Sequence, residues 1–396
     1  MKIKVGKITW LAISVLLITL SISKPIINIG AGNIVEYSGL LIILIGMFKS
    51  ISFKKNKQNK QNIRLLGIVL FVFSIGLILQ DMDITKKIEL VLSMFILSSI
   101  AIMPSPFMNN HNVLKAISNA IMLALVISCV MSLVTGVTIV TGASEGIIVK
   151  YGFDCGLEHR NYYSYTVFAA FMCDYLFMKI TRSYSRKPML FIEILLMLVS
   201  NSRSALLLLA IFFIICNFNK IRTSKHCKSI IVSFMILLGI IVGVPIYKVL
   251  ATNSETFFFR INGLNNYLSM YRGDMFHILF GNAAMAFKDS GLGYDYNIRS
   301  VIGWNGSTEL VILNVMIKNG VIGFIGYFLI FRNSLKKIIT SGNTFYSFLA
   351  MWTTFLISAF VESYVANINY IYTIVCYMVL ANVTGLVSKN KESVYK

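Results

Sequence analysis

Two arginines stand at the starts of apolar segments, where their positive charge is electrostatically unfavourable. Arg203 follows Ser202, whose residue type favours the N-cap position of a helix, and an apolar run begins there. Arg160 begins the apolar run after "GLEH", between His159 and Asn161. A helix N-terminus carries partial positive charge, so a cation at this position is stabilised when an anion binds beside it. Two such starts predict a site for a polyanionic group, bound by guanidinium and backbone N–H groups together.

Three further arginines lie among aromatic residues in a long polar segment. They are Arg260 in "FFFRING", Arg272 in "YLSMYRGDM" and Arg299 in "YDYNIRS". Aromatic rings commonly stack on sugars, and arginine pairs with phosphate. The alternative is a solvated loop with ordinary ion pairs, for example between Arg272 and Asp274. For Arg203, the alternative is a guanidinium that reaches lipid phosphates at a membrane surface.

Several ionisable residues lie near or within apolar runs, where they are costly and usually functional. Glu309 lies at the mouth of one run, and Lys318 lies farther into it. Glu36, Asp174 and Glu193 are also near or within such runs. For Asp174 and Glu193 the simpler interpretation is pairing with lysines of a nearby loop.

Known cofactor signatures are missing from the sequence. No zinc pattern, phosphate-binding loop, GxSxG segment or glycine-rich nucleotide fingerprint is present. The sequence therefore predicts no metal and no cofactor, and it argues against a mechanism driven by a cytoplasmic nucleotide. Five of the six cysteines lie in or beside apolar runs, and only Cys155 falls in a predicted loop, so we expect apolar fillers and no disulfide framework.

The composition is that of an integral membrane protein. Of the 396 residues 57% are hydrophobic and only 13% are charged, whereas about 25% is usual for soluble domains. The mean hydropathy is +0.75. The net charge of +20 does not indicate nucleic-acid binding, because the basic residues fall in short clusters between apolar runs.

These runs predict an all-α fold, a polytopic helical bundle with about twelve transmembrane helices and a range of ten to thirteen. A span needs about 20 mostly apolar residues, and helices satisfy every backbone group in lipid. The predicted spans are residues 8–23, 29–48, 65–80, 88–103, 113–141, 161–178, 188–200, 203–218, 229–248, 307–331, 345–361 and 366–387.

Charge bias orients the bundle with both termini in the cytoplasm. With that orientation the cytoplasmic segments hold 24 of the 36 basic residues and one acidic residue, Glu392, as the positive-inside rule requires. Merging residues 188–218 into one span would invert everything that follows. The chain is then a single membrane domain, residues 1–396, with two sizeable extracytoplasmic loops, 142–160 and 249–306. The longer loop, between spans 9 and 10, is predicted to carry short amphipathic helices at the membrane surface.

Three segments resemble one known family. "SNSRSALLLL" is similar to an S-R-[ST]-[AG] segment, "GLEHRNYYSY" to an outer G-x-x-H-x-N segment, and "ELVILNVMIKNGVIGFIGYFLIF" to the span that follows a long outer loop. These three patterns are typical of the polysaccharide polymerases of the O-antigen polymerase and ligase superfamily, commonly called Wzy. The chain therefore resembles this family, in particular its capsular and exopolysaccharide branch. The likeness covers much of residues 150–331. It departs at Glu309, where many members, notably the ligases, have histidine.

The resemblance implies a metal-free glycosyl transfer on the outer face of a bacterial cytoplasmic membrane. A glycan carried on undecaprenyl pyrophosphate would be transferred to another lipid-linked repeat unit, with release of undecaprenyl pyrophosphate. Cations must stabilise this leaving group, and a base must take the proton from the hydroxyl group of the acceptor sugar. We expect Arg160, Arg203 and the loop arginines, Arg272 first among them and then Arg260 and Arg299, to bind the pyrophosphate, and Glu309 to act as the base. His159 and Asn161, which flank Arg160, are expected to take part in substrate binding. Membrane lipids, a flippase and chain-length regulator proteins are the further expected partners.

Three alternatives remain open at this point. A ligase would transfer the glycan to a different acceptor, and only the Glu309 departure argues against it. A lipid-linked oligosaccharide flippase or another transporter would place basic residues along a central cavity, whereas here the candidate site arginines gather at the outer face. A SEDS-type peptidoglycan polymerase shares the chemistry, but it uses muropeptides and normally has about ten spans.

Overall fold

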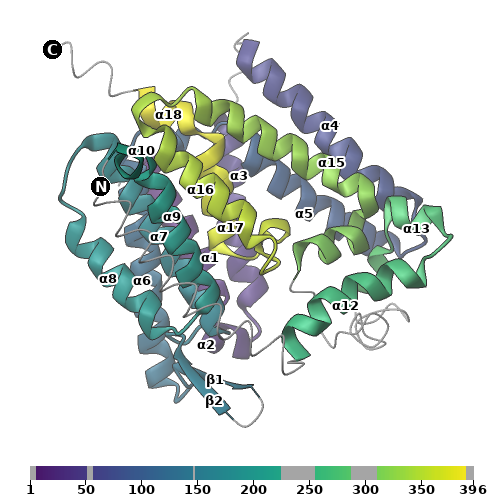
Figure 1. Cartoon of the computed structure of the whole chain (residues 1–396), viewed down its shortest axis with the longest axis horizontal. Helices are drawn as coiled ribbons and strands as arrows, with labels where there is room; N and C mark the ends of the chain where they lie inside the picture. The colour runs from purple at the N-terminus through teal and green to yellow at the C-terminus, as the bar shows by residue number, and fades with distance from the viewer. Residues whose placement is uncertain (1–5, 51–56, 146–147, 224–254, 287–309, 389–396) are drawn as a thin grey trace, which may run out of the picture.

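The computed structural model describes residues 6–50, 57–145, 148–223, 255–286 and 310–388. These residues form a mostly helical bundle with one small β-hairpin (Figure 1). The α-helices are α1 (Lys7–Ser21), α2 (Lys24–Asn28), α3 (Gly32–Ser50), α4 (Lys57–Leu79), α5 (Ile84–Ile102), α6 (Asn112–Val134), α7 (Arg160–Thr181), α8 (Lys187–Val199), α9 (Arg203–Cys216), α10 (Phe218–Thr223), α12 (Glu255–Met270), α13 (Met275–Phe280), α15 (Val311–Ile339), α16 (Phe345–Ser358), α17 (Ile371–Ala381) and α18 (Val383–Ser388).

Each predicted apolar segment that the structure describes contains a helix, although several helices are shorter than the predicted segment, for example α6, which ends at Val134 within segment 113–141. Segments 188–200 and 203–218 form the separate helices α8 and α9, as the charge bias required. Segment 229–248 lies outside the described residues. Within the described ranges four helices are long and apolar enough to cross a membrane: Asn59–Leu79, Ile84–Met108, Asn112–Val134 and Val311–Ile339. Several other apolar helices are shorter, for example α1 and α9.

Burial separates central helices from peripheral ones. Every residue of α17 is buried, and so is every residue of α7 from Tyr163 to Phe177, so both helices are enclosed on all sides and belong to the interior. The outer helices instead expose apolar side chains. On α6 these follow one helical stripe of Leu123, Val126, Val130 and Leu133. Such a continuous apolar surface is rare on soluble monomers and suits contact with lipid.

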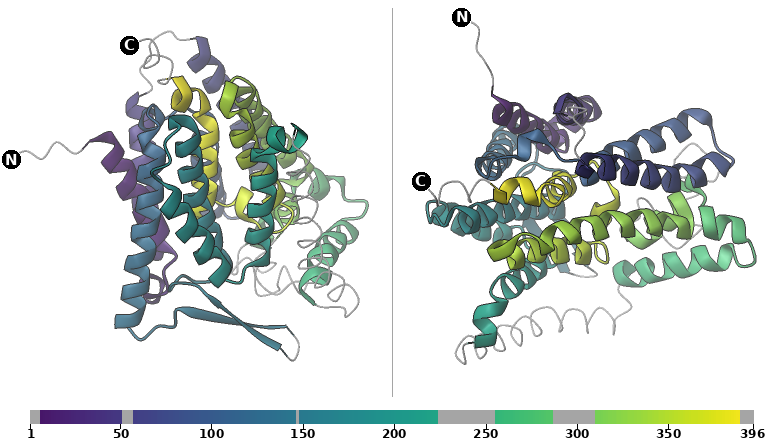
Figure 2. Two further views of the ribbon diagram at one scale, coloured as in Figure 1. Left: turned by 60° about the vertical axis from the view of Figure 1, so that its left-hand side comes forward. Right: turned by 90° about the horizontal axis from the view of Figure 1, so that it is seen from above.

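The two ends of the bundle differ in their structure. The starts of α7 and α9, helix α2 and the β-hairpin lie together at the lower end in Figure 1, whereas α10 and α18 lie at the upper end. The left view of Figure 2, turned about the vertical axis, shows the same separation. In the predicted topology the lower end is the extracytoplasmic one.

The β-hairpin was not predicted. Strands β1 (Val140–Glu145) and β2 (Ile148–Phe153) pair antiparallel in what we expected to be an irregular loop, and α6 ends at Val134 rather than continuing to 141. Pairing satisfies the backbone groups on the facing edges of the two strands. The hairpin is anchored through the buried Asp154, whose Oδ2 lies 2.6 Å from Lys24 Nζ and also accepts from the Thr141 hydroxyl.

Helix α15 contains a break at Gly320, which adopts φ 61° and ψ −160°. The Met316 and Lys318 carbonyls, which would accept N–H groups of the following turn in a continuous helix, here accept hydrogen bonds from Tyr267 and Gln80, each at 3.2 Å. Gly281 packs directly on the break, where a Cβ would lie 2.5 Å from the Ile317 carbonyl oxygen.

The same glutamine secures the predicted long loop to the bundle. Gln80 Nε2 donates to the Phe280 carbonyl, and its Oε1 accepts from the Ala283 N–H, both at 2.5 Å. The predicted loop helices α12 and α13 therefore pack against α4 and α15 through specific backbone contacts.

Candidate active site

Both sequence-predicted arginines begin a helix. Arg160 is the first residue of α7 and Arg203 the first of α9. His159 caps α7, because its ring Nδ1 accepts the Asn161 N–H at 3.1 Å. Ser202 occupies the expected N-cap position of α9, yet its hydroxyl makes no cap hydrogen bond. It is used in a contact between the two helices instead.

Asn161 joins the two helix starts. Its side-chain Oδ1 accepts from the Ser202 hydroxyl at 3.1 Å, and its Nδ2 donates to Glu362 Oε1 at 2.9 Å. Glu362 lies between α16 and α17 and is only 7% exposed. Three segments far apart in the sequence thus meet at one amide, which holds Arg160 and Arg203 at the same end of the bundle.

The β-hairpin packs against this junction. A Cβ at Gly152 would overlap the Ser200 carbonyl oxygen and would lie 2.7 Å from Cδ of Arg160, so glycine permits the close approach. Asn201, in the turn before α9, adopts φ 54° and donates to the Tyr151 carbonyl at 3.4 Å. The hairpin therefore fixes the stem of Arg160 and the turn that precedes Arg203.

A cluster of tyrosines adjoins the junction, on the side of the buried core. The Tyr370 hydroxyl donates to the Tyr162 hydroxyl at 2.9 Å, and their ring centroids are 4.7 Å apart. Tyr162 also contacts the His159 ring, with centroids 5.9 Å apart. Tyr165 and Tyr364 continue the cluster into the buried core. Tyr162 and Tyr370, which are only partly buried, are the members that a bound sugar can reach.

The loop arginines are not brought to this site by the described structure. Arg272 is exposed in the turn between α12 and α13, and in both Figure 1 and Figure 2 these helices lie across the molecule from α7 and α9. Asp274 pairs with His277, whose ring Nδ1 lies 2.5 Å from Asp274 Oδ2. The His277 side chain is also the main reason that the pKa of Asp274 is below its ordinary value.

Three other predicted site residues have side chains that the structure does not describe. Arg260 is part of α12, but its side chain is outside the described set. Arg299 and Glu309 both fall in residues 287–309 and are likewise outside it. Lys318 is half-buried and lies two residues before the Gly320 break.

The interpretation of Asp174 and Glu193 as partners of loop lysines was wrong. Asp174 is paired with Arg186, whose Nη2 lies 2.7 Å from Asp174 Oδ2, and the Ser118 hydroxyl bridges Asp174 to Glu193. Both carboxylates are completely buried, where an arginine fork satisfies several acceptors at once and a mobile lysine does not. This cluster lies at the opposite end of α7 from Arg160.

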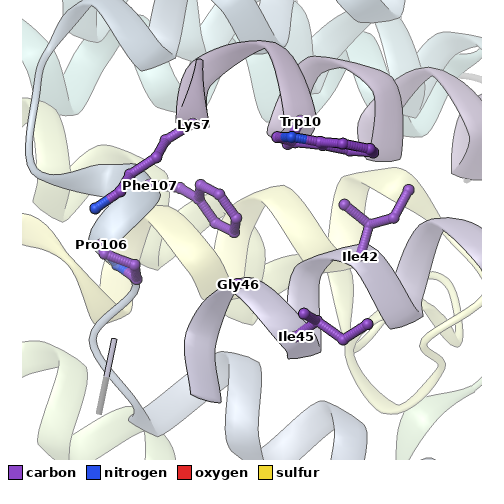
Figure 3. Close-up of a pocket in the computed structure, with 7 residues that line it drawn as sticks. All are labelled: Lys7, Trp10, Ile42, Ile45, Gly46, Pro106 and Phe107. Carbon is purple, nitrogen blue, oxygen red and sulfur yellow. The ribbon is translucent and has the colours of Figure 1, made fainter. Parts of the chain in front are cut away.

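Two of the cavities in the described part of the bundle lie at its opposite ends. One, of about 360 Å³, opens beside the arginine junction and is lined by Glu36, Glu158 and Tyr370 among others. The other, of about 430 Å³, lies at the far end of α1 and α3 (Figure 3). Its lining is mostly apolar, with Trp10 and Phe107 facing the space and Lys7 at its edge, so it does not suit a charged or hydroxylated substrate.

Sequence reasoning did not identify Glu362 or Glu158 as site residues. Partial burial raises the pKa of the Glu158 carboxyl above its ordinary value. Glu362 stands in "FVESYV", an acidic residue between two apolar runs, and that was the available signal. Among the residues that the structure describes, no group of three or more His, Cys, Asp and Glu side chains is placed to hold a metal ion.

Neither a protein-family model nor a curated protein matches this chain, so the arrangement of its own side chains carries the functional argument.

Proposed function

We propose that the chain is an integral-membrane glycosyltransferase of the Wzy type. It would join undecaprenyl-pyrophosphate-linked repeat units into a surface polysaccharide such as capsule, exopolysaccharide or O-antigen, on the outer face of a bacterial cytoplasmic membrane. This proposal includes the twelve-span topology with both termini in the cytoplasm. Its expected partners are the lipid-linked glycan, membrane lipids, a flippase and chain-length regulators.

The observation that supports the proposal best is the junction of the two arginine-bearing helix starts. Asn161 connects α7 to Ser202 at 3.1 Å, so two guanidinium groups and two positive helix ends belong to one end of the bundle. A departing pyrophosphate gains negative charge as its bond to the sugar breaks. Preorganised cations stabilise that charge in the transition state more than in the bound substrate, which is what accelerates the reaction.

The remaining roles follow from the sequence resemblance. Glu309 is the proposed base that takes the proton of the acceptor hydroxyl. Arg272, Arg260 and Arg299 are proposed to add positive charge when substrate binds. For Arg272 this requires a movement of α12 and α13 relative to the structure described, because these helices are held against Gln80 and the Gly320 break.

The test is a reconstituted polymerisation assay. Purified protein in liposomes receives the lipid-linked oligosaccharides extracted from membranes of the encoding organism, and ladder formation is followed by gel. Loss of one preorganised donor commonly lowers a rate by about 10²–10³-fold, so Arg203→Ala is expected to abolish the visible ladder. Glu309→Gln should do the same. Arg332→Ala, an exposed arginine in the second half of α15, is the matched control and should leave the ladder intact.

Other outcomes identify the alternatives. Lipid-linked substrate that crosses the bilayer without being elongated would replace the polymerase by a flippase. Transfer of the glycan to an acceptor without a lipid carrier would indicate a ligase. A ladder that persists in Arg203→Ala would refute the role given to this arginine.

A further inference from the structure

A polar cavity is lined by Glu158, which lies two residues before Arg160, and by Tyr370, whose hydroxyl bonds to Tyr162 beside Asn161. It has a volume of about 360 Å³, within the range of roughly 300–1,000 Å³ typical of small-molecule sites. Two carboxylates line it, Glu36 from the first turns of α3 and Glu158 from the segment before α7. Asn33, Asn369 and Tyr370 complete its polar lining.

Glu36 gives this cavity an unmet hydrogen-bonding requirement. Its side chain is only 5% exposed, and within the described part of the chain its Oε1 has no hydrogen-bond partner. Buried carboxylate oxygens are normally satisfied, because leaving one without a donor costs free energy. A ligand that presents O–H or N–H donors to the cavity would supply the missing bond.

The position of Glu158 is fixed by backbone pairing. Its N–H donates to the Ile22 carbonyl at 3.0 Å, and the Lys24 N–H donates to the Gly156 carbonyl at 2.8 Å. The Lys24 ammonium is paired with Asp154 at 2.6 Å, directed to the hairpin anchor. Glu158 is therefore held on the cavity wall two residues before Arg160.

The lining distinguishes between classes of ligand. Two carboxylates facing one space repel a phosphate or pyrophosphate, which belongs to the arginines instead. Carboxylate and amide oxygens beside an aromatic ring match the hydroxyl groups and the ring faces of a sugar. The Tyr370 hydroxyl also bonds to Tyr162, which contacts His159 beside Arg160, so the cavity and the arginine junction adjoin.

We infer that this cavity is a saccharide subsite, which binds the acceptor sugar through its hydroxyl groups while the arginines bind the pyrophosphate of the donor. The inference rests on the proposed function for the identity of the sugar. It adds a second site, of opposite charge to the first, and assigns Glu36 and Glu158 to the acceptor.

Carboxyl labelling tests the subsite without relying on activity. The probe is the free glycan released by mild acid from the extracted lipid-linked pool, which lacks pyrophosphate. Detergent-solubilised protein is treated with a water-soluble carbodiimide and a small amine, and labelling of Glu158 is measured by mass spectrometry. The glycan should protect Glu158, whereas inorganic pyrophosphate and calcium ions at the same concentration should not.

Variants locate the effect. Glu36→Gln should raise the glycan concentration that gives half-protection of Glu158 about tenfold, because the amide keeps an acceptor oxygen but loses the negative charge that strengthens the hydrogen bond. Glu89→Gln is the matched control on α5, an exposed glutamate outside the cavity lining, and should change nothing. Protection of Glu158 by calcium ions in place of glycan, or no protection by glycan, would overturn the subsite.

The ladder assay separates this inference from the proposed function. A ladder formed by the unmutated protein together with unprotected Glu158 would overturn the subsite and leave the polymerase standing. Protection of Glu158 without any ladder would support the saccharide site and remove the polymerase.

Discussion

One amide makes the polar contact between the starts of the two arginine-bearing helices, which also pack through aromatic side chains farther along, so Asn161→Ala is the most informative perturbation of the site. This change removes the Asn161 hydrogen bonds to Glu362 at 2.9 Å and to Ser202 at 3.1 Å. It keeps the first turn of α7, because His159 caps the Asn161 backbone N–H rather than its side chain. Arg160 and Arg203 would then remain at their helix starts, but the hydrogen bond from the Ser202 hydroxyl to Asn161, which links the two starts, would be lost.

The expected cost follows from the two bonds. A hydrogen bond to a charged group contributes about 1.5–3 kcal/mol and a neutral one about 0.5–1.5 kcal/mol. The free energy of unfolding should therefore fall by roughly 2–4 kcal/mol in Asn161→Ala. Ser202→Ala should lose only the neutral bond, and the double variant Asn161→Ala/Ser202→Ala should lose little beyond Asn161→Ala, because the two residues share that bond.

The assay is a double-mutant cycle on the unfolding equilibrium in mixed detergent micelles. The coupling between Asn161 and Ser202 should be about 0.5–1.5 kcal/mol. Asn217→Ala is the control, because its Nδ2 bonds only to Phe213 four residues earlier, at the other end of α9. Its coupling to Ser202 should stay below about 0.5 kcal/mol, the limit for independent sites. A coupling equally small for Asn161 would refute the claim that this amide ties the helices together.

Three other predictions concern the rest of the bundle. Gly320→Ala should lower the free energy of unfolding by roughly 2–5 kcal/mol, because φ is 61° and a Cβ would lie 2.4 Å from the Leu279 carbonyl oxygen. Gly67→Ala is the control, since a Cβ at this position meets nothing within 4 Å. It should leave the free energy of unfolding unchanged or raise it in the same assay. Arg186→Met should cost about 3–5 kcal/mol, because it leaves the buried Asp174 without its cation, while the exposed Arg182→Met should cost little. Because the Asp274 pKa is lowered, mainly by His277, its stabilisation of the α13 start is present above the ordinary aspartate pKa and is lost as pH falls through the lowered value. The amide protection factors of residues 275–280, corrected for the intrinsic pH dependence of exchange, should therefore fall on acidification, and in Asp274→Asn they should no longer depend on this titration.

The helical segments could be predicted because their signals are local. Apolar runs and the charge bias between them separated α8 from α9 at Arg203, a division that hydropathy alone would have missed. The onset of each apolar run, together with the N-cap preference of Ser202 in the case of Arg203, placed Arg160 and Arg203 at helix starts, and the structure confirms both positions. Each of these inferences used interactions within one or two helical turns.

The contacts that build the site could not be predicted, because they join residues far apart in the chain. Asn161 and Glu362 are 201 positions apart, and nothing in either segment indicates the other. The Gly320 break was also missed, since a glycine within an apolar run is tolerated in a continuous helix. Its conformation is set by Gly281, which packs on it from another segment.

The role of Gln80 has a consequence for biogenesis. Gln80 directly follows α4, yet its partners Phe280, Ala283 and Lys318 are 200 to 238 residues later in the chain. During synthesis Gln80 is therefore inserted long before its native hydrogen-bond partners, because at least 200 further residues must be synthesised first. Until then the first helices form an incomplete assembly with an unsatisfied amide at its surface, which is the kind of feature that membrane chaperones and quality-control proteases can recognise. Final assembly of the bundle is thus coupled to arrival of α15, and truncation before that helix should leave an unstable membrane intermediate rather than a smaller folded protein.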